Sequence, residues 1–389
     1  MARKAAPGAA VAATRTSFAL ALIWLAGAAA GAILPEDRTD VLYHSYSGGG
    51  LEVDGPSILV RKGFKDSVSV WGNYYVDLIT SASIDVVTTA SPYQERRDEQ
   101  SIGVDYLHGK TFLGLSYLKS DEDDYASNAA RFGISQDFFG DLTTLAISYA
   151  YGWDEVRRNG DDAFFDEAKR QAYRVDLSQI MTRNMIVSVN YETISDEGFL
   201  NNPYRSVRYA DSTSALGYSY EAEIYPRTRT SNAVAIRAKY FLPYRAALKV
   251  EYRHYNDTWG INAFNSEIEY IHPLPKGITL EVKYRYYDQT SADFYSDLFE
   301  RQQAQNFLAR DKELATFTTH TAGIGLSWQF DLADRIGFLK RGEISAMADY
   351  IRFSYDDFRD LRTTGVTPGT EPLYEFDSLV LRIFVSFWY

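Results

Sequence analysis

The sequence contains no cysteine, and this absence removes several classes of protein. Without thiols the chain cannot form disulfides, a thiolate metal site or a covalent haem attachment. Beyond about position 30 it also lacks any run of about 18 apolar residues, which excludes helical membrane spans. Acidic residues outnumber basic ones and give a formal net charge of -12. This charge argues against a nucleic-acid partner, because binding nucleic acid requires a basic surface.

The amino terminus has the pattern of a secretory signal peptide. Arg3, Lys4 and Arg15 precede an apolar stretch over residues 18–30, which ends in small residues suited to cleavage. The stretch is shorter than the roughly 20 residues that a membrane helix requires. We therefore expect residues 1–30 to be a cleaved signal peptide and residues 31–389 to form the exported domain.

Aromatic residues are abundant, at 15% of the chain, while the mean hydropathy is only -0.29. The last eleven residues, 379–389, alternate so that one face is wholly apolar or aromatic. Those residues are Leu379, Leu381, Ile383, Val385, Phe387 and Tyr389. A final strand that ends in an aromatic residue resembles the carboxy-terminal signal of bacterial outer-membrane barrels, which the assembly machinery recognises.

The same alternation recurs through the chain. One face of each segment is apolar and aromatic, and the other is small, polar or charged. These segments span residues 142–153, 171–180, 185–193, 248–253 and 278–286. Two such faces cannot both be buried in a dry core, so the pattern indicates strands with one face toward lipid and one toward water.

The connections between the segments alternate in length. Short connections with turn-forming residues occur at about 63–66, 108–110, 139–141, 181–184, 242–245 and 272–277. Longer polar connections occupy about 81–99, 121–127, 154–170, 196–229, 288–316 and 356–377. The short ones are expected to be periplasmic turns and the long ones external loops.

These observations predict an all-β fold, a transmembrane antiparallel up-and-down β-barrel of about 16 strands. Residues 216–224 are expected to form a hairpin or strand within a large loop, because Pro226 follows them. Residues 331–342 are long for a turn, and we expect one helical turn there.

Charged residues recur on the faces that should line the lumen. They are Arg174, Asp176, Glu192, Arg237, Lys239, Lys249, Glu251, Arg253, Glu267, Glu269, Glu281, Lys283 and Arg285. A tight turn would place Glu267 opposite Lys283, as a cross-strand ion pair. Two interpretations stay open: an internal ladder of salt bridges, or a surface that selects a charged solute.

The long connection at 288–316 is more apolar than a free external loop requires. Its apolar residues are Phe294, Tyr295, Leu298, Phe299, Phe307 and Leu308. They could form a constriction inside the barrel, dock another protein, or stack on neighbouring loops. Short helices are expected at residues 292–299 and 303–313.

Three runs carry a family resemblance: residues 202–209, 292–299 and 309–314. They resemble an uncharacterised, domain-of-unknown-function family of Gram-negative outer-membrane proteins, and the likeness extends from about residue 40 onward. The resemblance implies a barrel but no catalytic residue. It also implies a place near small lipoproteins and periplasmic redox proteins, which would be partners in an envelope complex.

Catalytic and metal chemistry find little support in the sequence. None of the 5 histidines has serine two residues onward, although a rim site that combines His254 or His320 with Asp257 or Asp288 stays open. The acidic run at residues 121–124 offers oxygen ligands for calcium but lacks the spacing of a calcium loop. We expect no catalytic residue, no cofactor and no bound metal.

The composition and pattern together predict a porin-like channel for small hydrophilic solutes in the outer membrane of a Gram-negative bacterium. The alternative is a barrel without a channel that holds a lipoprotein or a periplasmic redox partner. Outer-membrane lipids and the barrel assembly machinery are the expected partners in both cases.

Overall fold

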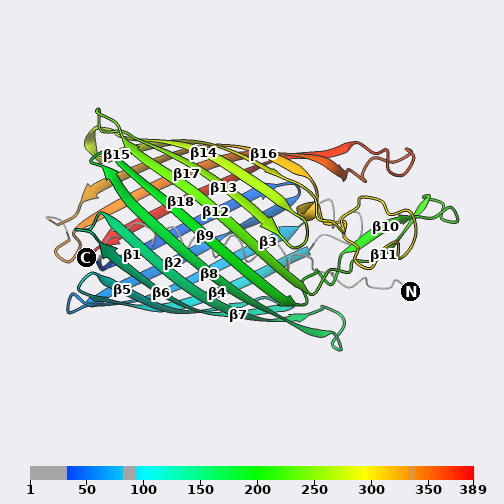
Figure 1. Ribbon diagram of the computed structural model, residues 1–389, viewed down its shortest axis with the longest axis horizontal. Helices are drawn as coiled ribbons and strands as arrows, with labels where there is room; N and C mark the ends of the chain where they lie inside the picture. The colour runs from blue at the N-terminus through cyan, green and yellow to red at the C-terminus, as the bar shows by residue number, and fades with distance from the viewer. Residues whose placement is uncertain (1–32, 82–92, 334–335) are drawn as a thin grey trace.

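The computed structural model describes residues 33–81, 93–333 and 336–389. The expected signal peptide, residues 1–30, lies outside the described residues. The described chain forms one closed antiparallel barrel of sixteen strands, seen from the side in Figure 1. No helix among these residues is long and apolar enough to cross a membrane.

The barrel strands follow one another around the wall in chain order. They are β1 (Arg38–Gly48), β2 (Leu51–Phe64), β3 (Val68–Ser81), β4 (Tyr93–His108), β5 (Thr111–Asp121), β6 (Tyr125–Phe138), β7 (Thr143–Arg157), β8 (Phe165–Thr182), β9 (Met185–Gly198), β12 (Thr228–Phe241), β13 (Ala247–Asp257), β14 (Asn262–Pro273), β15 (Ile278–Gln289), β16 (Phe317–Asp331), β17 (Arg341–Arg359) and β18 (Leu373–Trp388). A separate hairpin of β10 (Ser206–Ala210) and β11 (Tyr218–Ala222) lies between β9 and β12 in the sequence.

The last strand closes the barrel against the first. β18 pairs with β1 from Arg38↔Trp388 to Gly48↔Ser378. The Tyr389 hydroxyl then donates a hydrogen bond of 3.0 Å to the Arg61 carbonyl on β2. The terminal aromatic residue therefore links the carboxy terminus, across β1, to β2.

The outer wall is apolar. Val250, Ile268 and Tyr284 lie side by side on β13, β14 and β15, and their exposed fractions are 46%, 47% and 46%. A continuous apolar surface of this size is unfavourable in contact with water. The closed barrel also leaves no strand edge with unpaired backbone groups. Both properties are those of a barrel that crosses a membrane, with hydrocarbon around it.

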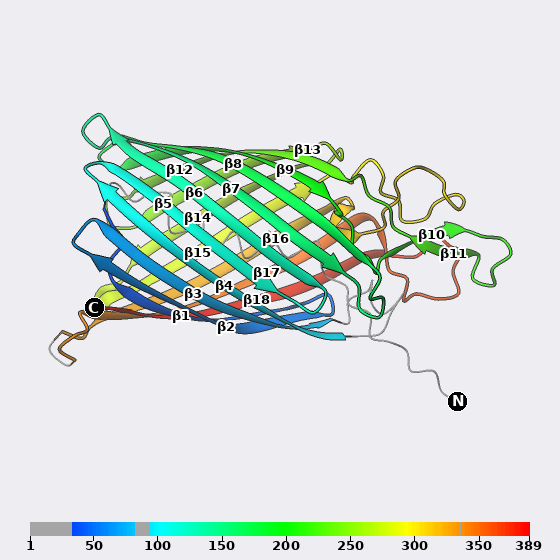
Figure 2. The same cartoon turned by 90° about the horizontal axis from the view of Figure 1, so that it is seen from below.

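The two ends of the barrel differ. At one end, here called the turn end, short turns join β2 to β3, β4 to β5 and the later pairs, and both β1 and β18 have their terminal residues there. The opposite end, the loop end, carries β10, β11 and the long connections, as Figure 2 shows. The predicted division into short turns and longer loops is confirmed, as is the strand count.

Three predicted loops are shorter than expected. β7 continues to Arg157 and β8 begins at Phe165, inside the predicted loop 154–170. β4 begins at Tyr93, inside the predicted loop 81–99. Only residues 122–124 separate β5 from β6. The strands extend into these polar segments because hydrogen bonds between side chains of neighbouring strands support the backbone pairing. One example is the bond of 2.6 Å that the Ser127 hydroxyl donates to Asp154.

The helices predicted at 292–299 and 303–313 are wrong, apart from one short 3-10 turn, η2 (Lys312–Leu314). The backbone of this loop instead forms bridges to other segments, between Tyr209 and Phe299 and between Ile224 and Leu308. The strand predicted within 216–224 is confirmed as β11. In the predicted helical turn at 331–342, Ile336 N donates to Leu332 O at 3.0 Å and Leu339 N donates to Ile336 O at 2.8 Å, and residues 334–335 lie outside the described chain.

Candidate functional site

The polar face of the strands forms the concave inner wall. Side chains of strands two apart meet there: Lys283 on β15 contacts Asp349 on β17 at 2.9 Å, across β16. Gly323 on β16 leaves the necessary room, because a Cβ at this position would lie 2.2 Å from Asp349 Oδ1. Such bridging contacts are compatible only with side chains that converge toward the barrel axis.

Many of the charged residues predicted to line the lumen form ion pairs. Arg174 contacts Asp176 at 2.7 Å and Glu192 at 3.7 Å. The Arg237 guanidinium donates to Glu251 at 2.6 Å. Lys249 contacts Glu267 at 3.0 Å and Glu269 at 2.8 Å. These contacts correspond to the salt-bridge ladder, one of the two interpretations of the sequence.

The predicted pairing of Glu267 with Lys283 is wrong. Glu267 lies opposite Arg285, and Lys283 lies opposite Glu269. The connection between β14 and β15 includes the 3-10 turn η1 (Pro275–Gly277) and sets the register from Pro273↔Thr279. Lys283 instead finds Asp349, a partner on β17 that the local alternation of β15 did not reveal.

Four of the predicted residues have no ion pair within the described part of the chain: Lys239, Arg253, Glu281 and Arg285. Lys239 and Arg285 are exposed although they point inward, and Arg253 is half-buried. Arg253 also lines a cavity of about 100 Å³ together with Arg174, Asp176 and Glu192. The inner wall therefore has water-accessible space beside unpaired cations.

A second inner cluster was missed. His44 Nε2 lies 2.6 Å from Asp77 and 3.0 Å from the Tyr75 hydroxyl, and the His44 and Tyr75 rings stack at 4.8 Å. Arg97 forms an ion pair with the same Asp77. The sequence holds no local signal for this cluster, because its members come from β1, β3 and β4.

The loop end carries a folded cap, which we define as residues 199–227, 258–261, 290–316 and 360–372. Phe294 packs against Tyr225 and Trp259, with ring centroids 5.4 Å and 5.2 Å apart. Val207, Phe299 and Leu308 form another buried cluster of the cap. The cap therefore has a core of its own.

The aromatic loop residues predicted for constriction or docking lie in this cap. Phe294, Phe299 and Leu308 are buried, whereas Phe307 is 41% exposed. The half-buried Tyr295 donates to the Asp357 carbonyl at 3.2 Å. Leu298 lies against Gly369 of the last loop. These contacts correspond to packing of the aromatic loop on neighbouring loops, one of the three hypotheses left open by the sequence.

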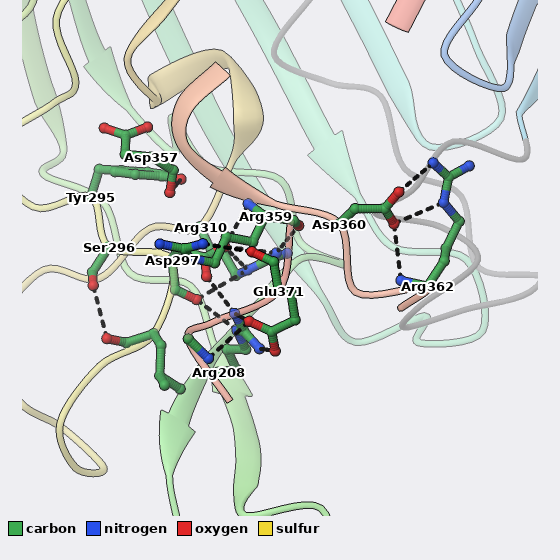
Figure 3. Close-up of polar contacts among 12 residues, drawn as sticks. Arg208, Tyr295, Ser296, Asp297, Arg310, Asp357, Arg359, Asp360, Arg362 and Glu371 are labelled. Carbon is green, nitrogen blue, oxygen red and sulfur yellow. Dashed lines mark hydrogen bonds and ion pairs between the residues drawn. The ribbon is translucent and has the colours of Figure 1, made fainter. Parts of the chain in front are cut away.

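A buried network of ion pairs joins three loops of the cap, as Figure 3 shows. Arg208, which is fully buried, donates to Glu371 at 2.5 Å and forms a second ion pair with Asp297. Arg310 contacts the same Asp297 at 2.9 Å. Burial opposes the charge of Glu371, but the hydrogen bond from Arg208 holds the pKa of Glu371 below its usual range.

A buried carboxyl pair lies beside this network. Glu223 accepts hydrogen bonds of 2.8 Å from the Tyr225 hydroxyl and 2.8 Å from the Arg310 amide. The Tyr225 hydroxyl lies 3.5 Å from Asp311, and Asp311 forms an ion pair with Arg205. Burial, followed by the charge of Asp311, raises the pKa of Glu223 to about 7, although Arg205 opposes the shift.

The raised pKa of Glu223 predicts a pH-dependent cap. The stability contributed by the protonated form is complete below the unfolded pKa of about 4.3 and is lost as the pH rises through about 7. Hydrogen exchange of the cap, corrected for intrinsic rates, should show weaker protection at pH 8 than at pH 5. The Glu223→Gln variant should lose that difference. Equal pH dependence in both proteins would contradict the assignment.

The acidic run at 121–124 contributes to one cluster of carboxylates. Oxygen atoms of Glu95, Glu122 and Asp124 lie within 4.8 Å of one another. The Tyr204 hydroxyl donates to Asp124 at 2.5 Å and accepts from the Asn159 amide at 2.6 Å. These carboxylates could ligate a hard cation. The hydrogen bonds of Tyr204 also attach the cap to the β5–β6 and β7–β8 connections at the loop end.

The structure does not assemble the rim site considered for catalysis. Asp257 forms its ion pair with Arg229, and Asp288 accepts from the Tyr286 hydroxyl at 3.1 Å. His320 Nδ1 lies 2.7 Å from the Tyr284 hydroxyl. In the described chain, neither carboxylate hydrogen-bonds to His254 or His320.

Solved structures similar to this chain are outer-membrane proteins at low sequence identity. A bacterial polysaccharide outer membrane secretin has a TM-score of 0.49 and 9% identity, over 92% of this chain and 100% of that chain. The outer membrane protein opdK from Pseudomonas aeruginosa has a TM-score of 0.42 and 9% identity, over 91% and 99%. The siderophore receptor PirA from Pseudomonas aeruginosa has a TM-score of 0.41 and 11% identity, over 91% of this chain but only 63% of the receptor.

No curated protein matches the chain. A family model does match, over residues 79–176 and 165–359, which together cover most of the barrel and the cap. The resemblance noted in the sequence is thereby confirmed. The chain belongs to the family described as Protein of unknown function (DUF3570).

Proposed function

We propose that this barrel is an outer-membrane channel for small hydrophilic solutes. The observation that carries the proposal is the exposure of Lys239 and Arg285, two cations on the inner wall. A side chain that points toward the axis of a closed barrel can be exposed only where water-accessible space remains. About sixteen strands also form a cylinder wide enough to hold water.

The part of the wall next to the charged strands supports the same proposal, since β7 pairs with β8. The inward positions of β6 and β7 carry small residues, among them Ala129, Gly133, Ala146, Ala150 and Gly152. Their outward neighbours are large, as with Phe132 and Ile147. The small inward residues leave volume in the lumen beside the charged residues.

Planar-bilayer conductance tests the channel. The purified, folded protein should give discrete current steps that grow with salt concentration. The Ala146→Trp variant, which fills space next to the inner cavity, should lower the step size, whereas Ile147→Trp on the outer face of the same strand should not. A folded protein without steps would contradict the proposal.

The proposal includes export by a cleaved signal peptide over residues 1–30 and insertion by the barrel assembly machinery, with the loop end outside the cell and the turn end in the periplasm. Cell fractionation of the full-length chain should recover a shortened protein in the outer membrane. Recovery of the uncleaved chain in the inner membrane would contradict this part.

A second candidate is a barrel without a channel that holds a lipoprotein or periplasmic redox partner. The folded cap favours it, because ordered loops at the mouth leave less room for a solute. Leu216 and Val366 of the cap are also exposed apolar residues. Isolation from native membranes distinguishes the two: a stoichiometric partner together with absent current steps would favour the scaffold.

A further inference from the structure

We propose that the inner wall at Arg253 and Arg285 is a binding site for small organic anions that carry a carboxylate or a phosphate. The inference rests on the proposed function, since it places the site in a water-accessible lumen. It identifies the class of solute that the wall selects. It also chooses between the two interpretations of the inward charges.

The first step is the balance of charges after pairing. The carboxylates nearest to the two arginines already have cationic partners: Glu251 accepts from Arg237 at 2.6 Å and Glu267 contacts Lys249 at 3.0 Å. The described residues provide no ion pair for Arg253 or Arg285. Lys249 is shared between Glu267 and Glu269, so the four cations Arg237, Lys249, Arg253 and Arg285 face three carboxylates, and one positive charge remains at this part of the wall.

The second step is the position of the two arginines. Arg253, Asn265 and Tyr287 lie in one row on β13, β14 and β15. Arg285 lies two residues before Tyr287 on the same face of β15. Because neighbouring strands are about 4.8 Å apart, the flexible arginine side chains can reach one small anion in front of Asn265.

The charges of Arg285, Arg253 and Arg229 all act on the Tyr287 hydroxyl, and the charge of Asp288 opposes them. Arg229 is occupied by Asp257. The hydroxyl proton of Tyr287 is donated to Gln289 at 2.6 Å, so this ring contributes a wall of the site and the arginines contribute its donors.

The third step is the chemistry of the donors. A guanidinium presents N–H groups in a planar fork that fits the two oxygens of a carboxylate or phosphate. Arg285 is exposed and Arg253 half-buried, so both can exchange water for a ligand. The unpaired inward carboxylate on β15, Glu281, is separated from Arg285 by Lys283, which binds Asp349. Anions are therefore favoured over cations at this point.

The site lies directly below the cap. Gln289 donates hydrogen bonds of 2.9 Å and 2.8 Å to the carbonyls of Glu313 and Ala315, at the end of the cap loop 290–316. A solute that enters from the loop end would meet the arginines as soon as it passes this loop. The position is suited to selection at the entrance.

Two measurements on the full-length, folded barrel test the proposal. Calorimetric titration in detergent, with succinate and inorganic phosphate as separate probes, measures binding without requiring a channel. The reversal potential in a KCl gradient measures selectivity. We expect binding of at least one probe and a preference for chloride. Binding of succinate alone would assign a carboxylate site, and binding of phosphate alone a phosphate site.

The test variants are the double substitutions Arg253→Gln/Arg285→Gln and Arg253→Lys/Arg285→Lys. The glutamine pair should weaken binding at least about tenfold, since charge-assisted hydrogen bonds are lost, and should shift selectivity toward potassium. The lysine pair keeps the charge but not the planar fork, so it should retain chloride preference and bind the probes less tightly. Arg352→Gln, on the outer face, is the matched control.

The results separate this inference from the proposed function. A wild-type barrel that binds neither probe, or a glutamine pair with unchanged binding and selectivity, would overturn the anion site. If the glutamine pair fails to fold, the lysine pair decides by its binding alone, and unchanged affinity overturns the site. Absence of current steps would overturn the channel, while the titration would still decide the anion site.

Discussion

Replacement of Arg208 by methionine is expected to unfold the cap and leave the barrel intact. Arg208 has an exposed fraction of 0% and forms ion pairs with Asp297 and Glu371. Removal of one partner from a buried ion network leaves uncompensated charge and costs about 3–5 kcal/mol. Because β10 and β11 form a sheet separate from the barrel, the loss should remain local.

Hydrogen exchange read by mass spectrometry measures this effect. Protection should fall in β10, β11 and the cap loops 290–316 and 360–372, and stay constant in β13 to β17. Arg362→Met is the matched control: Arg362 pairs with Asp360 at the surface, where an ion pair contributes about 0–1 kcal/mol. Addition of Glu371→Gln to Arg208→Met should restore part of the protection, because the remaining buried charges, Arg310 and Asp297, then form a balanced pair. An unchanged cap in the single variant would contradict the network's role.

The second large effect is expected at the outer wall. Ile268 lies between Val250 and Tyr284 near the middle of β14, and all three side chains are exposed. An arginine at the lipid-facing midplane of a barrel destabilises it by about 2–4 kcal/mol. The Ile268→Arg variant should therefore lower the free energy of unfolding from lipid vesicles by that amount.

Denaturant titration in vesicles checks this prediction. Leu216→Arg is the control, since Leu216 is also exposed and apolar but lies in the cap, outside the membrane. Its effect should be within about 0.5 kcal/mol, as for ordinary surface substitutions. Equal small effects of both variants would mean that the outer wall does not face hydrocarbon.

The barrel itself could be predicted from the sequence because its determinants are local. Alternation with period two identifies a strand and its faces within a few residues, as in the segment with Val282, Lys283 and Tyr284. Turn-forming residues at 63–66 and 108–110 mark the short connections. The register between two strands depends on the exact turn that joins them, and a different turn shifts every pair along the strand. For this reason the predicted pairing of Glu267 with Lys283 was wrong.

The cap could not be predicted because its contacts join distant parts of the chain. Arg208 and Glu371 are separated by 163 positions. The spacing of the apolar residues in 292–299 is compatible with a helix. In the structure, however, the backbone groups of this segment form β-bridges to other segments, such as the bridge between Tyr295 and Ala309. For the inner wall the sequence predicts a set of inward charged residues, but it does not predict their pairing. The ion pairs of Glu251 and Glu267 in the structure determine which of the cations have no ion pair among the described residues.

Cysteine labelling along β15 tests the central claim, that successive side chains face lipid and a water-accessible lumen in turn. The chain has no cysteine of its own, so single variants at Val282, Lys283, Tyr284 and Arg285 can be compared in proteoliposomes. A membrane-impermeant maleimide should label positions 283 and 285 and spare positions 282 and 284. Uniform labelling, or labelling of the outward pair alone, would contradict the account.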